Sequence, residues 1–138
     1  MNERSGVFKM KKYTHTEAFE FYGTSPRNVQ WSWSALNEET KTVVVTLWQN
    51  EFSRKDGVTV YERSERGKWA KGPGYRDFLA HLVWAKLHCN GVVRLIIAIP
   101  NSSGTGKKIK ECFPKEALRM RVVSVEETSG AFALEQVA

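Results

Sequence analysis

One acid and two histidines recur at helical spacing within residues 75–89. Asp77, His81, Trp84 and His88 follow one another at i, i+4, i+7 and i+11, so a helix would place them in one stripe. A carboxylate one turn before an imidazole can orient that imidazole as a general base. No nucleophile or third ligand accompanies the pair at a fixed spacing, and histidines on helix flanks are usually structural. Asp77 and His81 are therefore weak catalytic candidates.

A glycine-lysine loop at 104–108 is a second candidate for chemistry. Its sequence, Gly-Thr-Gly-Lys-Lys, follows an apolar run, as a phosphate-binding loop follows a strand. The spacing fails, because Asn101 stands where the first glycine is required and Lys108 stands where a serine or threonine is required. What remains is a Ser/Gly loop flanked by Lys107, Lys108 and Lys110, whose charges suit a phosphate backbone. The alternative is a plain solvated loop.

Metal-dependent nuclease chemistry would use an acid on one strand and an acid with a lysine two residues later on the next. The one such pair near the predicted hairpin, Glu-Thr-Lys at 39–41, falls in a turn, where side chains are poorly aimed. The other acids that such an enzyme would use are Glu51, Glu62 and Asp77. Because no set stands out, the preferred interpretation is non-enzymatic, with no cofactor and no metal. A metal-dependent nuclease, or another enzyme of nucleic acids, remains the first alternative.

Tryptophans are the stronger feature. Three of the five, Trp31, Trp33 and Trp48, fall in one predicted hairpin, and Trp69 lies in the basic, glycine-rich segment 63–76. Bases stack on exposed aromatic rings for about 1–3 kcal/mol each, while neighbouring Arg and Lys hold the phosphates. Core filling is the competing explanation for the hairpin tryptophans. We expect at least one of them to line a groove whose rim comes from 63–76.

Charge is unevenly distributed along the chain. The net charge is +6, and three segments, 1–12, 63–76 and 107–121, carry the excess of Lys and Arg. Positive charge gathered in a few segments is typical of a protein with a basic surface that binds a polyanion. The alternative is that these charged loops are merely solvated. Residues 1–12 are expected to form a loosely ordered basic arm.

The length of 138 residues fits a single domain, 1–138, with one core. Two cysteines, Cys89 and Cys112, predict no disulfide framework and no zinc site, and both are interpreted as small buried hydrophobes. No apolar run is long enough for a membrane span, and residues 1–15 lack the apolar segment of a secretory signal. The expected location is cytoplasmic.

The elements that would position these residues are helices and strands with short connections. Residues 14–23 predict a short capped helix, 57–62 a short strand, 75–89 the main helix ending at Asn90-Gly91, and 92–99 a central strand buried on both sides. The apolar stripe of the main helix is predicted to be Phe78, Leu79, Leu82, Val83 and Leu87. Residues 106–113 suggest one or two helical turns. Residues 118–137 predict a terminal hairpin turning at 128–130.

The first hairpin is predicted from 29–36 and 41–48, with a turn at 37–40. In this register Trp33 faces Val44, Trp31 faces Thr46 and Val29 faces Trp48, so the three tryptophans share one face. The order of elements predicts an α+β fold with a mixed, largely antiparallel sheet that could curl into a half-barrel, with one main helix and short helices packed on it.

The preferred function is a nucleic-acid-binding module that holds single-stranded DNA or RNA, or modified or flipped bases, on a basic surface with exposed tryptophans. A protein-binding adaptor or inhibitor is a further alternative, and a pocket for a planar anion also stays open. Nucleic acid is thus the expected partner and no membrane is involved. The residues assigned to binding are Trp31, Trp33, Trp48, Arg63, Arg66, Lys68, Trp69, Lys71, Lys107, Lys108 and Lys110.

Overall fold

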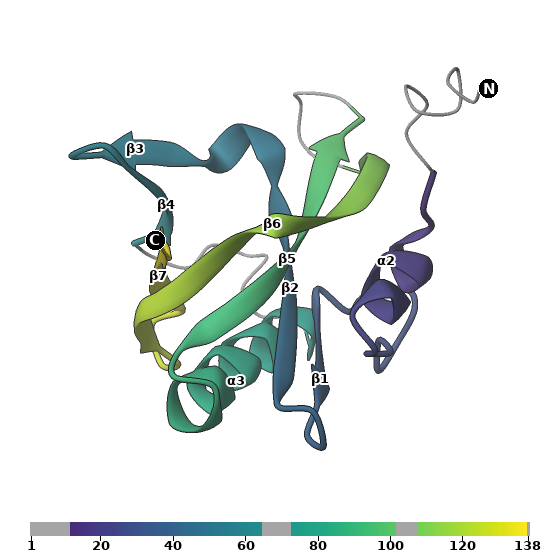
Figure 1. The fold of residues 1–138 in the computed structure, drawn as a ribbon, viewed down its shortest axis with the longest axis horizontal. Coiled ribbons are helices and arrows are strands. Elements are labelled where there is room, and N and C mark those ends of the chain that lie inside the picture. The colour runs from purple at the N-terminus through teal and green to yellow at the C-terminus, as the bar shows by residue number, and fades with distance from the viewer. Residues whose placement is uncertain (1–11, 65–72, 102–107, 138) are drawn as a thin grey trace.

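The fold is built on one mixed sheet with a helix on each face. We describe it from a computed structural model, which describes residues 12–64, 73–101 and 108–137. Seven strands lie in the order β1-β2-β5-β6-β7-β4-β3 (Figure 1). The pair β2–β5 is parallel and every other pair is antiparallel. The predicted α+β class with a largely antiparallel sheet is therefore confirmed.

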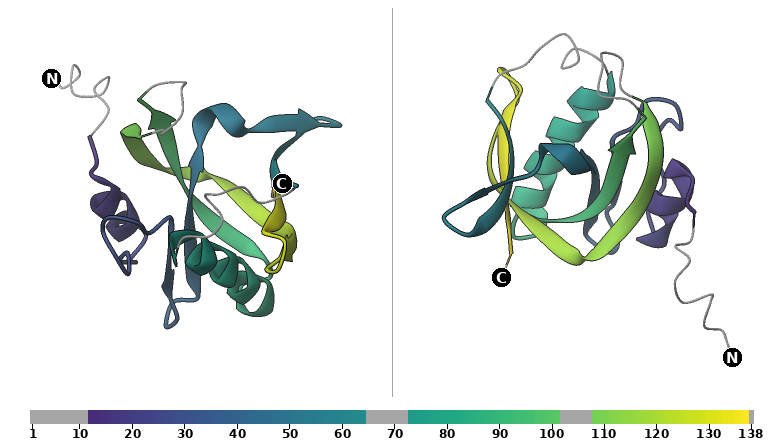
Figure 2. Two further views of the ribbon diagram at one scale, coloured as in Figure 1. Left: turned by 180° about the vertical axis from the view of Figure 1, so that it is seen from behind. Right: turned by 90° about the horizontal axis from the view of Figure 1, so that it is seen from above.

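The bounds of the elements show how the chain fills this sheet. In chain order they are α2 (His15–Phe21), β1 (Ser34–Asn37), β2 (Thr42–Trp48), the 3-10 turn η1 (Gln49–Glu51), β3 (Ser53–Lys55), β4 (Val58–Arg63), α3 (Pro73–His88), β5 (Val92–Pro100), β6 (Ile109–Glu126) and β7 (Ala131–Gln136). Parallel strands require a long crossover connection, and α3 lies in the one that joins β2 to β5. The sheet curls around the side that carries α3 but does not close into a barrel (Figure 2).

The larger core lies between the sheet and α3. The helix buries Phe78, Leu79, Leu82 and Ala85, which pack on alternate residues of the strands. The strand residues of this core are Val43, Val45, Leu47, Tyr61, Val93, Leu95, Ile97, Met120, Val122, Phe132 and Leu134. The prediction that Leu87 belongs to the apolar stripe was wrong, because Leu87 is 72% exposed. At 3.6 residues per turn, position 87 lies on the opposite side of the helix from the buried positions 78, 82 and 85.

A smaller core lies on the other face, beneath α2. Ala18 and Phe19 of the helix pack on Ala35, Val44, Ile96 and Cys112. Thr14 and Glu17 form a capping box that satisfies the first free amides of α2. A helix of seven residues has little stability alone, so its position depends on this packing.

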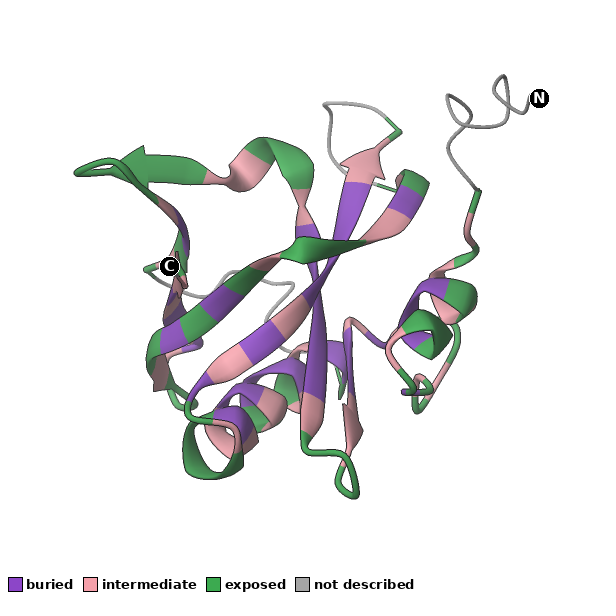
Figure 3. Cartoon of the chain, in the orientation of Figure 1, coloured by how far each residue is buried: buried purple, intermediate pink, exposed green. Residues whose placement is uncertain are grey.

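Strand β6 corrects one prediction and confirms another. The segment 106–113 was expected to be helical, but Ile109 already pairs with Pro100 and the strand continues to Glu126. Pro114 is accommodated because the β5–β6 register shifts beside it, and a proline is tolerated where a ladder is irregular. The terminal hairpin of β6 and β7 forms as predicted. Buried and exposed residues alternate along its β6 arm, whereas β2 is buried almost throughout (Figure 3).

The first hairpin is shorter than predicted, and its register differs. Asn37 pairs with Thr42, and the turn is 38–41, where Lys41 has φ 54°. The predicted register was therefore wrong by two residues, which leaves the two faces unchanged because the side-chain period is two. The strand also does not begin at Val29. The Asn28 side chain accepts bonds from the next backbone amides, folding 28–31 into a turn.

Two further strands complete the far end of the sheet. The predicted strand at 57–62 is β4, and β3 precedes it as an unpredicted partner. Asp56 and Gly57, with φ 51° and 80°, connect the two. Positive φ at both central residues is the requirement of a tight hairpin turn, for which Asp-Gly is a preferred sequence.

Candidate functional site

Two of the hairpin tryptophans meet in an aromatic cluster with α2. The ring centroids of Trp33 and Trp48 are 5.3 Å apart, and the His15 ring lies 5.8 Å from Trp33 and 4.7 Å from Phe19. Both tryptophans are partly exposed. Trp31 lies in a turn and Trp33 directly precedes β1, so only Trp48 belongs to a strand. The prediction that all three share one strand face was therefore wrong.

His15 is held in the aromatic cluster as a neutral side chain. Its Nε2 is 2.7 Å from the Oγ1 of the buried Thr46, which makes a hydrogen bond whose direction depends on the tautomer. Burial lowers the pKa of His15 to about 4. The ring is therefore uncharged at neutral pH and supplies a packing surface and a hydrogen bond, not a cation.

The first turn of α3 packs closely against Trp31 and Trp33. A Cβ at Gly74 would lie 2.1 Å from the carbonyl oxygen of Trp31 and 3.4 Å from Cδ1 of Trp33. The absence of a side chain at Gly74 thus sets how closely α3 approaches these residues. This contact also brings the start of α3, directly after residues 65–72, beside Trp31 and Trp33.

We expect Gly74→Ala to destabilise the protein by about 1–3 kcal/mol because the added carbon collides with backbone. In an ordinary helix the same change stabilises by about 0.5–1 kcal/mol, so the sign is diagnostic. Urea unfolding measures the difference. Arg76→Ala, an exposed change two residues further along the same helix, should stay within about 0.5 kcal/mol of the parent. A Gly74→Ala protein as stable as the parent would contradict the close approach.

Strand β4 ends in a polar network beneath Trp48. The Tyr61 hydroxyl accepts from the Trp48 amide at 3.2 Å and donates to Glu51 at 3.2 Å, and Arg63 forms an ion pair with the same carboxylate. Burial and the Glu51 charge raise the pKa of Tyr61 to about 12. Arg63, expected to contact phosphate, is thus engaged by Glu51.

Part of the predicted binding set, and residues 1–11 of the predicted basic arm, belong to segments other than those described. Arg66, Lys68, Trp69, Lys71 and Lys107 lie outside the described residues. Of the remaining predicted lysines, Lys108 and Lys110 are exposed where β6 begins, and the Lys108 carbonyl accepts from the Asn101 amide at 2.7 Å.

The acid and histidine of α3 adjoin a serine, in an arrangement that does not suit nucleophilic catalysis. The Ser34 Oγ is 2.6 Å from His81 Nδ1, and Asp77 forms an ion pair with Arg27 at 3.1 Å. Burial lowers the pKa of His81, and the nearby Asp77 charge opposes this shift. A nucleophile must reach its substrate, but Ser34 is only 1% exposed. The geometry therefore supports a structural hydrogen bond between β1 and α3.

The candidate acids of a nuclease lie in separate networks. Glu51 is bound by Arg63 and Tyr61, Glu62 by Lys55, and Asp77 by Arg27. Within residues 12–64, 73–101 and 108–137, no three His, Cys, Asp or Glu side chains are grouped as metal ligands. The described geometry therefore gives the nuclease alternative no support.

An arginine cluster on the α2 side of the sheet was not anticipated. Arg94 of β5 lies directly opposite Arg119 of β6, and Arg121 follows on the same face opposite Val92. The Arg121 side chain also packs over Gly91, since its Cγ is 3.2 Å from where a Cβ of that glycine would be. Lys41, in the turn before β2, lines the same hollow as Arg94. We call Lys41, Arg94, Arg119 and Arg121 the cationic surface.

The charges of the cationic surface are not neutralised by ion pairs in the described part of the chain. The guanidinium of Arg94 lies 5.4 Å from the Tyr22 ring centroid, and its buried Nε has no hydrogen-bond partner among the residues described. Glu135 pairs with Arg121 across the β6–β7 ladder, and Glu116 lies close enough to Tyr22 that burial and the Glu116 charge both raise the pKa of that tyrosine. Neither forms an ion pair with these arginines.

Alternation in 118–122 could have revealed part of the cationic surface. Arg119 and Arg121 alternate with the buried Met120 and Val122, which is the pattern of a strand with one charged face. Arg94 was harder to anticipate, because it interrupts an apolar run that otherwise predicts burial on both sides.

Comparison of the chain with protein-family models, curated protein sequences and solved structures gives no match. The helices in the described parts of the chain are all too short or too polar to cross a membrane. The function is therefore inferred from the geometry of the chain itself.

Proposed function

We propose that the protein binds nucleic acid through the cationic surface. The observation that carries this proposal is the cross-strand pair Arg94–Arg119, with Arg121 beside it and no ion pair from any of the three to a carboxylate in the described chain. Like charges directly opposite one another on a sheet are destabilising. A polyanion lying across this face would replace that repulsion with attraction to several phosphates at once.

The overall charge supports a polyanion in preference to a small anion. The net charge of +6 exceeds what one phosphate group would neutralise, and Lys108 and Lys110 add exposed charge at the start of β6. Phosphate contacts of this kind position a nucleic acid without specifying its sequence. The proposed activity is binding with little sequence preference.

The aromatic cluster is proposed as a stacking site for the same strand. Trp48 lies six residues along β2 from Thr42, or about 20 Å at the rise of a strand, so a single-stranded segment of several nucleotides could span both regions. Replacing Trp48 by leucine is expected to weaken binding of single strands by about 1–3 kcal/mol while leaving its salt dependence unchanged.

Fluorescence anisotropy with a labelled single-stranded oligonucleotide tests the binding proposal. We expect the logarithm of the binding constant to fall linearly with the logarithm of salt concentration, with a slope of about −3 if four cations each contact a phosphate of a single strand. A duplex of the same sequence provides the comparison with double-stranded DNA. Absence of binding at low salt, or binding that salt does not weaken, would refute the proposal.

A further inference from the structure

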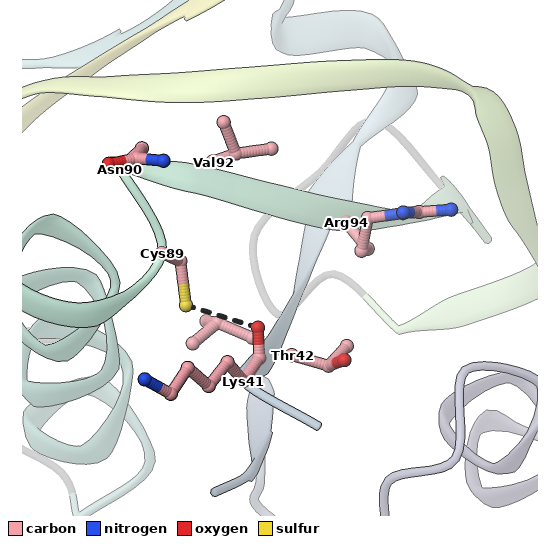
Figure 4. A pocket seen from close by; sticks show the side chains of 7 residues that line it. Lys41, Thr42, Cys89, Asn90, Val92 and Arg94 are labelled. Atoms are coloured by element: carbon pink, nitrogen blue, oxygen red, sulfur yellow. Dashed lines mark hydrogen bonds between the residues drawn. The ribbon is translucent and has the colours of Figure 1, made fainter. Parts of the chain in front are cut away.

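A shallow hollow opens in the cationic surface where β2 and β5 begin. It has a volume of about 180 Å³ and is lined by Lys41, Thr42, Val43, Cys89, Asn90, Val92 and Arg94. Two turns form its rim: the β1–β2 turn ending at Lys41 and the α3–β5 turn around Asn90. The two turns are joined by a hydrogen bond from the Cys89 thiol to the Lys41 carbonyl, with a sulfur–oxygen distance of 3.2 Å (Figure 4).

The charged, polar and apolar groups that line the hollow lie in different parts of it. Figure 4 shows Lys41 extending toward α3 at one end, while the Arg94 side chain extends away from Cys89 at the other. Thr42 and Asn90 supply a hydroxyl and an amide along the sides, and Val92 supplies an apolar patch. Arg121 lies next to this site over Gly91. An elongated ligand with negative groups at both ends and a less polar centre would match this order.

We propose that the hollow seats one segment of a sugar-phosphate backbone, with consecutive phosphates at the Lys41 and Arg94 ends and the intervening sugar over Val92. This inference rests on the proposed function and identifies where on the cationic surface the strand lies. The Asn90 amide donates a hydrogen bond to one phosphate oxygen. The Thr42 hydroxyl, which lies 2.9 Å from the Thr40 hydroxyl, accepts from Thr40 and donates to another phosphate oxygen. Arg119 and Arg121 hold the next phosphates as the strand crosses from β5 to β6.

Cys89 provides a direct probe of occupancy. Its thiol is half-buried in the hollow, whereas Cys112 is buried in the smaller core with 4% of its surface exposed. Burial raises the pKa of Cys89 and the nearby Lys41 charge opposes this, so alkylation by iodoacetamide should be followed at about pH 8.5, where more thiolate is present. Mass spectrometry of peptides separates the two cysteines.

A saturating oligonucleotide is expected to slow alkylation of Cys89 at least about fivefold, because the strand covers the thiol and its phosphates oppose thiolate formation. Alkylation of Cys112 should not change. A second experiment replaces the oligonucleotide by inorganic phosphate at the same ionic strength. The proposal requires that the oligonucleotide protect Cys89 more strongly than free phosphate does when both supply the same concentration of phosphate groups. Equal or greater protection by free phosphate would show a site for a single oxyanion and overturn the backbone assignment.

Variants separate this inference from the proposed function. Lys41→Gln and Thr42→Val should each weaken oligonucleotide binding about three- to tenfold, since each removes one phosphate contact. Lys55→Gln, on the far edge strand β3, is the control and should bind as the parent does. If the parent binds no oligonucleotide, the proposed function fails. If it binds but Cys89 stays fully reactive and Lys41→Gln matches Lys55→Gln, only the hollow is excluded.

Discussion

Replacing Arg94, Arg119 and Arg121 together by glutamine is expected to weaken oligonucleotide binding about 100-fold at low salt. Each arginine is assigned one phosphate contact, and loss of one such contact typically weakens binding similarly for all sequences. A plot of the logarithm of the binding constant against the logarithm of salt concentration should become less steep by about 2, because three phosphate contacts are removed. Anisotropy titrations at several salt concentrations measure both quantities.

A charge-matched variant distinguishes the cationic surface from net charge alone. The control replaces Arg54, Lys55 and Arg76, which lie on the edge strand β3 and on α3, by glutamine. It removes three positive charges, as the test variant does, but should weaken binding only severalfold through the long-range field. Equal loss in both variants would mean that no particular surface is used. Because Arg94 also contacts Tyr22, its replacement could disturb the fold. The double variant Arg119→Gln, Arg121→Gln should therefore be measured beside the triple variant, and thermal unfolding should show that the triple variant is folded.

Acidification is expected to lower stability by about 2–3 kcal/mol through His15 between neutral pH and about pH 4.5. In the folded protein burial lowers the pKa of His15 to about 4, whereas the unfolded chain has the ordinary value near 6.5. The unfolded state therefore takes up the proton first as pH falls. Stability is fully present above about pH 6.5 and is lost progressively down to about pH 4. The lowered pKa of His81 acts in the same direction.

Urea unfolding of the parent and of His15→Gln at several pH values isolates this contribution. Glutamine can still hydrogen-bond Thr46 but does not titrate, so the loss of stability on acidification should shrink by the amount assigned to His15. His88→Gln, at the exposed end of α3, is the control and should retain the pH dependence of the parent. A His15→Gln protein with an unchanged pH profile would exclude His15 as the source. Since α2 is short, protonation should release this helix before the main core unfolds, which amide exchange along 15–21 would detect.

The parts of the fold that were predicted correctly are those with a strong local pattern. The β6–β7 hairpin, the helix α3 and the buried strand β5 each follow from periodicity and from turn residues close in sequence. The start of β6 was missed because Lys110 and Glu111 make it polar, and its pairing with β5 across 102–107 outweighs that local preference. Strand β3 was missed although Asp56-Gly57 indicates a tight turn.

The geometry of the candidate site could be predicted from the sequence only in part, for reasons that lie in tertiary structure. Trp33 approaches Trp48 because it directly precedes β1, the neighbour of β2, and its carbonyl accepts from the Thr46 amide at 2.9 Å. A hairpin pattern can anticipate this proximity. The pairing of Arg94 with Arg119 joins residues 25 positions apart through a register that includes a bulge, and no local pattern encodes it. The approach of α3 to Trp31 likewise depends on Gly74, whose role appears only when the helix is docked.

The position of β7 has a consequence for how the protein emerges from the ribosome. This strand lies between β6 and β4, so the β3–β4 ribbon is attached to the rest of the sheet through a strand that is synthesised after the other six strands of this sheet. Until β7 has left the exit tunnel, both β4 and β6 expose an unpaired edge, which is a template for pairing with other chains. Nascent chains should therefore be most prone to misassembly in the interval before the β6–β7 hairpin closes.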